Sequence, residues 1–234
     1  MADEFDSGAL EQYPSAEVRD RIREGVDAVI AAIPGVGGSL QILFDSVIQP
    51  SLHKRQEEWL VRLGELVNEL LIRDENFRIE DLIGDEAFVS AVIDASRIAE
   101  RTHIQAKLVI LKNCLMNLVT DSYLGDFMTA LFFRYVDELQ PEHFIVLRYL
   151  ANPGEWFDSH EIARPNHTFA SQQLLMNAAQ LPVEGQILQQ VLKDLGDRSL
   201  ASTGSMTTTT SGGSIWNGVV SEVGRQLLQF VRDS

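Results

Sequence analysis

The stretch Ile33-Pro34-Gly35-Val36-Gly37-Gly38 joins two apolar helical patterns, and we expect the N-terminal domain to be organised around it. Residues 29 to 44 carry no charged side chain, but the proline and the three glycines interrupt this run. Proline removes a backbone donor, and glycine costs about 1 kcal/mol relative to alanine inside a helix. The stretch therefore predicts a helix that ends near Ile33, a tight turn, and a second helix capped by Ser39. Together these form an apolar helical hairpin.

This hairpin has two interpretations, and the sequence leaves both open. In the first, the two helices are buried in the protein's own core. In the second, residues 26 to 52 enter or lie on a membrane, with the basic residues His53-Lys54-Arg55 near lipid head groups. The run is too interrupted for a permanent span, which needs ~20 consecutive apolar residues. The candidate residues of this hairpin or membrane element are Pro34, Gly35, Gly37, Gly38, Leu40, Leu43 and Phe44.

The composition limits the classes of partner and compartment. The chain has 234 residues, enough for one large or two small domains, and a net charge of −15. Because affinity for nucleic acid depends on Lys and Arg displacing counterions, this charge argues against nucleic acid as a partner. The single cysteine, Cys114, excludes an internal disulfide, and the acidic N-terminus does not resemble a signal peptide. We therefore expect a cytoplasmic protein, with membrane association only on activation.

Apolar residues recur at spacings of three and four from the hairpin as far as residue 139. This periodicity predicts a helical bundle of five or six helices over residues 15 to 139. One of these helices spans 86 to 101, with Asp85 as its N-cap, and another spans 122 to 139. Residues 1 to 14 are acidic and poor in apolar groups, so we expect a disordered tail there.

The predicted elements change in character over residues 140 to 234. A helix that begins at Pro141 ends at Asn152-Pro153-Gly154, and Asp158-Ser159-His160-Glu161 has the pattern of a capping box. Four further elements follow: a helix at 168 to 179, a helix at 183 to 195, a Thr-rich hairpin centred on Gly212-Gly213, and a closing helix at 221 to 232. This is the order of a winged-helix module. The predicted fold class is therefore mainly α, with an N-terminal helical bundle and a C-terminal winged-helix-like domain.

No constellation in the sequence has the pattern of a catalytic or metal site. Cys114 and His103 are eleven positions apart on one predicted helix, about 16 Å along its axis, too far for a nucleophile–base pair. His160 and His167 lack the short spacings of zinc ligands. We therefore predict a non-enzymatic protein with no catalytic residue, no cofactor and no metal. The three tryptophans are interpreted as packing anchors: Trp59, Trp156 and Trp216.

A DNA-binding transcriptional regulator is the alternative that a winged helix raises. In such a module the helix before the wing enters the major groove. In this sequence the corresponding residues, 184 to 194, include one basic side chain, Lys193, and the predicted hairpin at 205 to 214 includes none. We therefore favour a module that binds protein or is purely structural.

Four stretches carry a resemblance to known proteins: Ile33-Pro34-Gly35-Val36-Gly37-Gly38, His53-Lys54-Arg55-Gln56-Glu57-Glu58-Trp59-Leu60, Leu139-Gln140-Pro141-Glu142-His143-Phe144-Ile145-Val146-Leu147 and Val223-Gly224-Arg225-Gln226-Leu227-Leu228-Gln229-Phe230. With them, the chain resembles a loose set of uncharacterised bacterial proteins and, more distantly, the abortive-infection alpha proteins of phage defence. The shared motifs are structural, so no functional residue is transferred. The resemblance implies a bacterial, defence-associated accessory or effector. We expect it to act through a protein partner or self-association, or through conditional membrane association.

Overall fold

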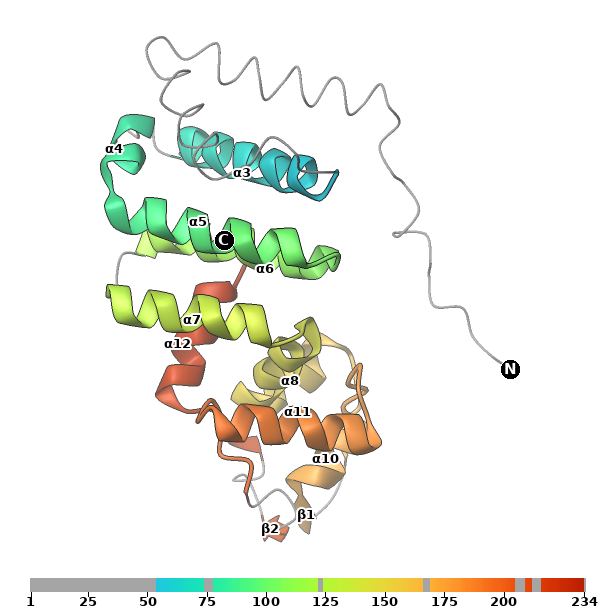
Figure 1. The fold of residues 1–234 in the computed structure, drawn as a ribbon. Helices are drawn as coiled ribbons and strands as arrows, with labels where there is room; N and C mark the ends of the chain where they lie inside the picture. Colours follow the sequence, from blue (N-terminus) through green and yellow to red (C-terminus); the bar gives the residue numbers. More distant parts are fainter. Residues whose placement is uncertain are drawn as a thin grey trace. The chain divides into compact units, whose positions relative to one another are not determined.

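The computed structural model describes residues 54–73, 78–121, 124–165, 169–204, 209–211 and 216–233. Over these residues the protein is mainly helical, which confirms the predicted fold class at that level (Figure 1). The acidic tail and the hairpin residues, Pro34 to Phe44, lie outside the described residues. The chain divides into two compact units, Met1–Ser96 and Arg97–Ser234, with the boundary inside one helix. The domain division expected between residues 139 and 140 stays a prediction.

The described part of the first unit consists of α3 (Lys54–Arg73), α4 (Ile79–Gly84) and the first turns of α5 (Glu86–Arg101). Trp59 is 2% exposed, and its indole Nε1 donates to Ser96 Oγ at 2.8 Å. Ser96 Oγ in turn donates to the carbonyl of Val92, at 2.7 Å. The indole N–H is therefore satisfied within the core, and Trp59 is the packing anchor that the sequence predicts.

Helix α5 begins where the sequence predicts. Asp85 Oδ1 accepts hydrogen bonds from the backbone N–H groups of Ala87, at 2.9 Å, and Phe88, at 3.3 Å. These N–H groups belong to the first turn of the helix, where no backbone carbonyl is available to them. A short carboxylate side chain at the N-cap is thus sufficient to fix the start of α5.

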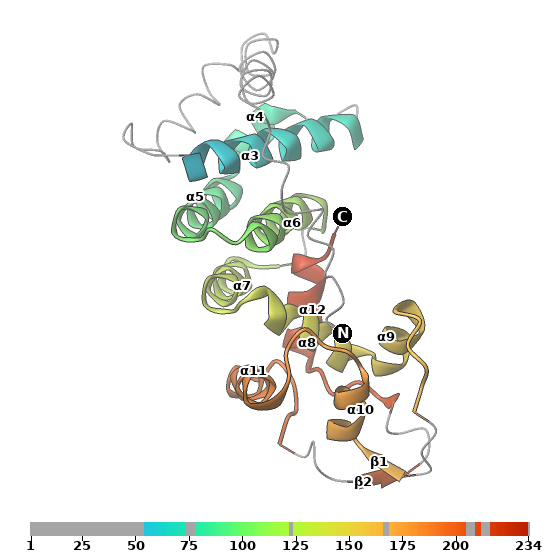
Figure 2. The same ribbon diagram turned by 90° about the vertical axis from the view of Figure 1, so that its right-hand side faces the viewer.

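The second unit contains the end of α5, a two-stranded sheet and seven further named helices over the described residues. In chain order these elements are α6 (Gln105–Asp121), α7 (Asp126–Glu138), α8 (Pro141–Ala151), α9 (Pro153–Ser159), β1 (Phe169–Ser171), α10 (Gln172–Ala178), α11 (Gly185–Asp197), β2 (Thr209–Ser211) and α12 (Glu222–Val231). Helix α12 packs against α6 and α8, and α11 packs against the same α8 (Figure 2). Helix α8 is therefore the central element of this unit.

The end of α12 is held by two buried asparagines of α6. The side-chain Nδ2 of Asn117 donates to the carbonyls of Phe230 and Arg232, both at 2.9 Å, and Asn113 Nδ2 donates to Asp233 Oδ1 at 2.8 Å. The last carbonyls of a helix have no partner within the helix itself. The asparagines of α6 supply that partner from more than one hundred residues earlier in the chain.

The predicted hairpin is described only in part, because its centre, Gly212-Gly213, lies outside the described residues. Strand β2 pairs antiparallel with β1, and Phe169 lies opposite Ser211. The ends of the predicted wing meet in an isolated bridge between Ala201 and Val220. The bridge thus joins the two ends of residues 201 to 220, and β2 within this range pairs with the segment before α10.

Two local predictions in this part of the chain are wrong. Residues 169–171 form β1 where the sequence predicts a helix from 168, because the helix starts only after Ser171, whose Oγ accepts from Leu174 N. The predicted capping box at Asp158 lies at the end of α9. The N-cap of α9 is Asn152, whose Oδ1 accepts from Glu155 N at 3.2 Å, with Pro153 in the first turn.

Candidate functional site

The exposed side of α11 is the most distinctive surface of the second unit. Leu188, Val191, Leu192 and Leu195 form the buried stripe of this helix, which packs on α8. Six other side chains of the helix are exposed, among them Ile187 at 65%, while Asp194 is half-buried. We call the exposed residues the α11 outer face: Gln186, Ile187, Gln189, Gln190, Lys193 and Asp197.

The charges of the α11 outer face cancel within the face. Lys193 Nζ donates to Asp197 Oδ2, one helical turn away. The hydrogen bond from Lys193 and the negative charge of Asp197 raise the pKa of Lys193, so the amine is held in its charged form. The single cation on this face is therefore already paired, and the remaining polar groups are neutral amides.

A histidine–aspartate contact fixes α11 against α8. The backbone N–H of Gln140 donates to His143 Nδ1 at 3.2 Å, so the ring proton is on Nε2 and faces Asp194 Oδ2 at 3.3 Å. Gln190 Nε2 donates to the other carboxylate oxygen at 2.8 Å. Partial burial alone would raise the pKa of Asp194, but these hydrogen bonds and the charge of Arg198 lower it overall. Asp194 is thus an ionised acceptor shared by two helices.

The end of α11 is tied to α7 by Arg198. Its Nη2 donates to Glu138 Oε2 at 2.9 Å, and its Nη1 donates to the carbonyl of Asp194 at 3.1 Å. The position of α11 is therefore set at two polar points in addition to its apolar stripe. A helix held in this way presents its outer face on a rigid support.

Two glycines, Gly218 and Gly224, allow the chain on either side of the bridged Val220 to approach its neighbours closely. A Cβ on Gly218 would lie 2.0 Å from the carbonyl oxygen of Ala151, and a Cβ on Gly224 would lie 2.2 Å from that of Leu200. The backbone N–H of Val219 donates to Leu150 O at 2.9 Å, across the same contact. The chain therefore passes directly over the end of α8, and only glycine fits at these two positions.

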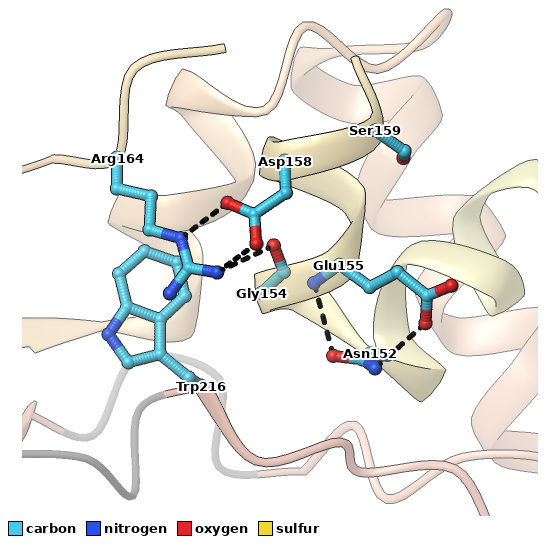
Figure 3. Close-up of a pocket in the computed structure, with 7 residues that line it drawn as sticks. All are labelled: Asn152, Gly154, Glu155, Asp158, Ser159, Arg164 and Trp216. Atoms are coloured by element: carbon cyan, nitrogen blue, oxygen red, sulfur yellow. Dashed lines mark hydrogen bonds and ion pairs between the residues drawn. The ribbon is translucent and has the colours of Figure 1, made fainter. Parts of the chain in front are cut away.

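A shallow, open hollow lies between α9 and Trp216 (Figure 3). Arg164 Nε donates to Asp158 Oδ1 at 2.9 Å, and Nη2 donates to the carbonyl of Gly154 at 3.2 Å. The guanidinium carbon lies 5.1 Å from the centre of the Trp216 ring, close enough for a cation–π contact. Arg164 thus covers the face of the Trp216 ring. We interpret its contacts as structural, because they fix residues 162–165 against α9.

The reactive residue types that the sequence singles out are dispersed. Cys114 is fully buried, and burial raises the pKa of its thiol well above the ordinary value. His103 is exposed in the connection between α5 and α6, not on the helix that carries Cys114. The ring of His160 stacks on Trp156 with centroids 3.8 Å apart. These three residues are therefore not brought together.

Two kinds of site are absent from the described residues. No group of three His, Cys, Asp or Glu side chains is placed there to hold a metal ion. Among the helices of that part of the chain, none combines the length and apolar character that crossing a membrane requires. Comparison with models of protein families, with curated proteins and with solved structures finds no match to this chain.

The sequence predicts the helix that the structure shows as α11 and its scarcity of basic residues, but not the groups that position this helix. The contact between His143 and Asp194 joins residues 51 positions apart, and Arg198 reaches Glu138 over 60 positions. No local spacing signals such pairs. For Arg164 and Asp158, six positions apart, the available signal was their opposite charge at the end of α9 and in the loop that follows it.

Proposed function

We propose that this protein is a non-enzymatic interaction protein whose C-terminal part is a winged-helix-like module that docks another protein on the α11 outer face. The order of elements supports this module: α8, β1, α10, α11, β2 and α12, with β1 paired to β2 and the short helix α9 inserted between α8 and β1. In winged helices, the helix that precedes the wing is the one that meets the ligand. Here that helix is α11, and its outer face is open.

The chemistry of the α11 outer face favours protein over DNA. A duplex surface carries phosphate charges, which are neutralised by several Lys and Arg side chains in specific and non-specific complexes alike. This face offers one lysine, which Asp197 already pairs, next to amides and the exposed Ile187. Amides and an exposed aliphatic side chain suit a protein surface, and this composition is the observation that carries the proposal.

Site-specific photo-crosslinking in growing cells tests the proposed docking. A photoreactive residue at Ile187 is expected to give discrete protein adducts, because this position is at the edge of the outer face. The matched control is Phe127, which is 77% exposed on α7 and lies on a different helix. No adduct above the level at Phe127, with the protein still folded, would contradict the proposal.

Fluorescence anisotropy with a duplex oligonucleotide at low salt tests the alternative. Low salt favours counterion release and is the most permissive condition for DNA binding. We expect no saturable binding at protein concentrations up to about 100 µM. The affinity would then be weaker than that of proteins that bind DNA non-specifically. Micromolar affinity that falls steeply with added salt would instead support a DNA-binding regulator.

The wider proposal is that the protein acts in bacterial phage defence, and it rests on the sequence resemblance. Conditional membrane association would then depend on residues 26 to 52, outside the described residues. A charge introduced as Leu43→Asp is expected to abolish membrane association in fractionated cells, because burying an unpaired charge in lipid is costly. If the unaltered protein never reaches the membrane fraction, including under phage infection, the hairpin has no membrane role.

A further inference from the structure

We infer that the partner on the α11 outer face is a second copy of this chain, bound antiparallel about a two-fold axis at the middle of α11. This inference rests on the proposed docking function and names its partner. Four residues carry it, because they form the central stripe of the outer face: Gln186, Gln190, Lys193 and Asp197. At 100° per residue they lie within about 60° of one another around the helix.

The spacing of this stripe is symmetric. Positions 186 and 197, and positions 190 and 193, are each equidistant from the point midway between residues 191 and 192. Helix α11 spans Gly185–Asp197, so this point almost coincides with its centre. In a two-fold pair, residue i contacts residue j and j contacts i. An antiparallel pair centred here therefore places Gln186 opposite the partner's Asp197, and Gln190 opposite the partner's Lys193.

The groups that this symmetry places together are complementary. A lysine amine only donates hydrogen bonds, a carboxylate only accepts them, and a glutamine amide does both. Gln190 can accept from the partner's Lys193, while Gln186 can donate to the partner's Asp197. No like charges stand opposite one another, and the exposed Ile187 flanks the stripe on each copy. A single stripe of four residues thus forms four complementary contacts across the pair.

The charge of the whole chain favours this face for self-association. Each copy carries a net charge of −15, so two copies repel over most of their surfaces. The α11 outer face has one Lys and one Asp, and therefore no net charge. Two copies that meet through this face avoid the local repulsion that an acidic face would add.

The size of α11 sets the expected affinity. A helix of 13 residues is about 20 Å long, and one side of it offers less than the ~800 Å² per partner of a standard interface. We therefore expect a weak dimer, with a dissociation constant of about 10–100 µM, near the lower limit of specific interfaces. Such a dimer forms at high local concentration and is monomeric in dilute solution.

Sedimentation equilibrium of the full chain in about 150 mM salt, over roughly 2–500 µM, tests the inference. The unaltered protein is expected to change from monomer to dimer in this range. The variant Gln190→Lys places two amines opposite each other at both contacts between positions 190 and 193, and the dissociation constant should rise at least tenfold. Thermal melting at low concentration separates this effect from misfolding.

The double variant Gln190→Lys with Lys193→Gln is the decisive control. It has the same composition and net charge as the unaltered chain, and it restores an amine opposite an amide at both contacts. Dimerisation should therefore return to within about threefold of the unaltered protein. Failure of the double variant to restore the dimer would overturn the proposed register.

Two other results would overturn the inference as a whole. An unaltered protein that stays monomeric at 500 µM would exclude a second copy as the partner at this affinity. A dimer that Gln190→Lys leaves intact must form through another surface. The variant Phe127→Ser then tests the surface around Phe127, the most exposed aromatic side chain of the described residues. A crosslink from Ile187 to a different protein would contradict the dimer but support the docking function. Failure of the dimer can therefore be distinguished from failure of the docking function.

Discussion

Helices α11 and α12 are both amphipathic and both pack on α8, yet the structure uses them differently. Of the ten residues of α12, two are exposed, Glu222 and Arg225, and its end is capped by asparagines of α6. Of the 13 residues of α11, seven are exposed, and its polar contacts lie at its edges. Both helices thus have an apolar stripe, but α12 is enclosed by the fold and α11 leaves one side exposed to solvent.

The difference lies in what the far side of each helix meets. Phe230 of α12 contacts Phe132 and Phe133 of α7, with ring centroids 5.6 and 5.5 Å apart, so α12 has neighbours beyond α8. The α11 outer face has no aromatic side chain that could make such a contact, and its Ile187 is 65% exposed. We conclude that α12 closes the fold and that α11 presents a surface. Substitutions on the two helices should therefore differ in their cost to stability.

The largest effect is expected for Asn117→Asp on α6. Asn117 is 2% exposed, and its amide donates to three carbonyls at the end of α12, those of Gln229, Phe230 and Arg232. A carboxylate there cannot donate and is left as a buried charge among acceptors. The free energy of unfolding should fall by about 3–5 kcal/mol. Chemical denaturation measures this loss, with Asn117→Ala as the neutral comparison.

Asn117→Ala should cost about 2 kcal/mol, since it removes the donor without adding a charge. If both Asn117 variants unfold with the same free energy as the unaltered protein, α12 is not held by α6. The contrast between the two helices would then be wrong.

A smaller loss is expected for Gly224→Ala in α12. Alanine favours a helix by about 1 kcal/mol over glycine, but its Cβ would lie 2.2 Å from the carbonyl oxygen of Leu200. The backbone must move, and overpacking of this kind costs about 1–3 kcal/mol. We expect a net loss in thermal and chemical unfolding. Gly84→Ala is the matched control, since a Cβ there meets no atom within 4 Å.

The contact between α8 and α11 predicts a smaller, pH-dependent effect for Asp194→Asn. The pKa of Asp194 is lowered in the folded state, so the unfolded chain takes up this proton first as the pH falls. The carboxylate therefore contributes stability above about pH 4, and this contribution is lost as the pH falls through its lowered pKa. At pH 7 the variant should be less stable by up to about 1 kcal/mol.

Denaturation of both proteins at pH 7, 4 and 2 measures this dependence. The gap between the unaltered protein and Asp194→Asn should close toward pH 2. A gap that widens over the same interval would contradict the assigned role of Asp194.

The smallest effect is expected for Gln190→Lys on the α11 outer face. At about 2 µM, where the proposed dimer is dissociated, the free energy of unfolding should change by no more than about 0.5 kcal/mol, as for other surface substitutions. Thermal melting checks this value. A loss above 1 kcal/mol would show that the outer face supports the fold, and the distinction between α11 and α12 would lose its basis.

The sequence predicts those features that depend on nearby residues. Asp85 caps α5 through the backbone N–H groups two and three residues further on, and the apolar stripe of α11 follows from its own spacing. Strand β1 was missed because its partner, β2, lies 40 positions later, while its residues precede a well-capped helix. Non-local pairing overrode a helical pattern at this point.

The sequence predicted the charge of the candidate site, but not the contacts that hold α11 in place. The scarcity of basic side chains on α11 can be read directly from residues 184 to 194. The partners that fix this helix, His143 and Glu138, are on α8 and α7, and their contacts arise only when those helices pack. The candidate hairpin residues, from Pro34 to Phe44, lie outside the described residues, and their role stays a prediction.

The contact between the asparagines of α6 and the end of α12 can form only late in protein synthesis. Asn117 and the carbonyl of Gln229 are 112 residues apart. At a synthesis rate of about 5–20 residues per second, about 6–22 s pass between the appearance of the donor and of its acceptor. During this interval the α6 surface that will receive α12 has no cover in the nascent chain. Translation speed over residues 118 to 229 therefore sets how long α6 is available to chaperones or to neighbouring chains.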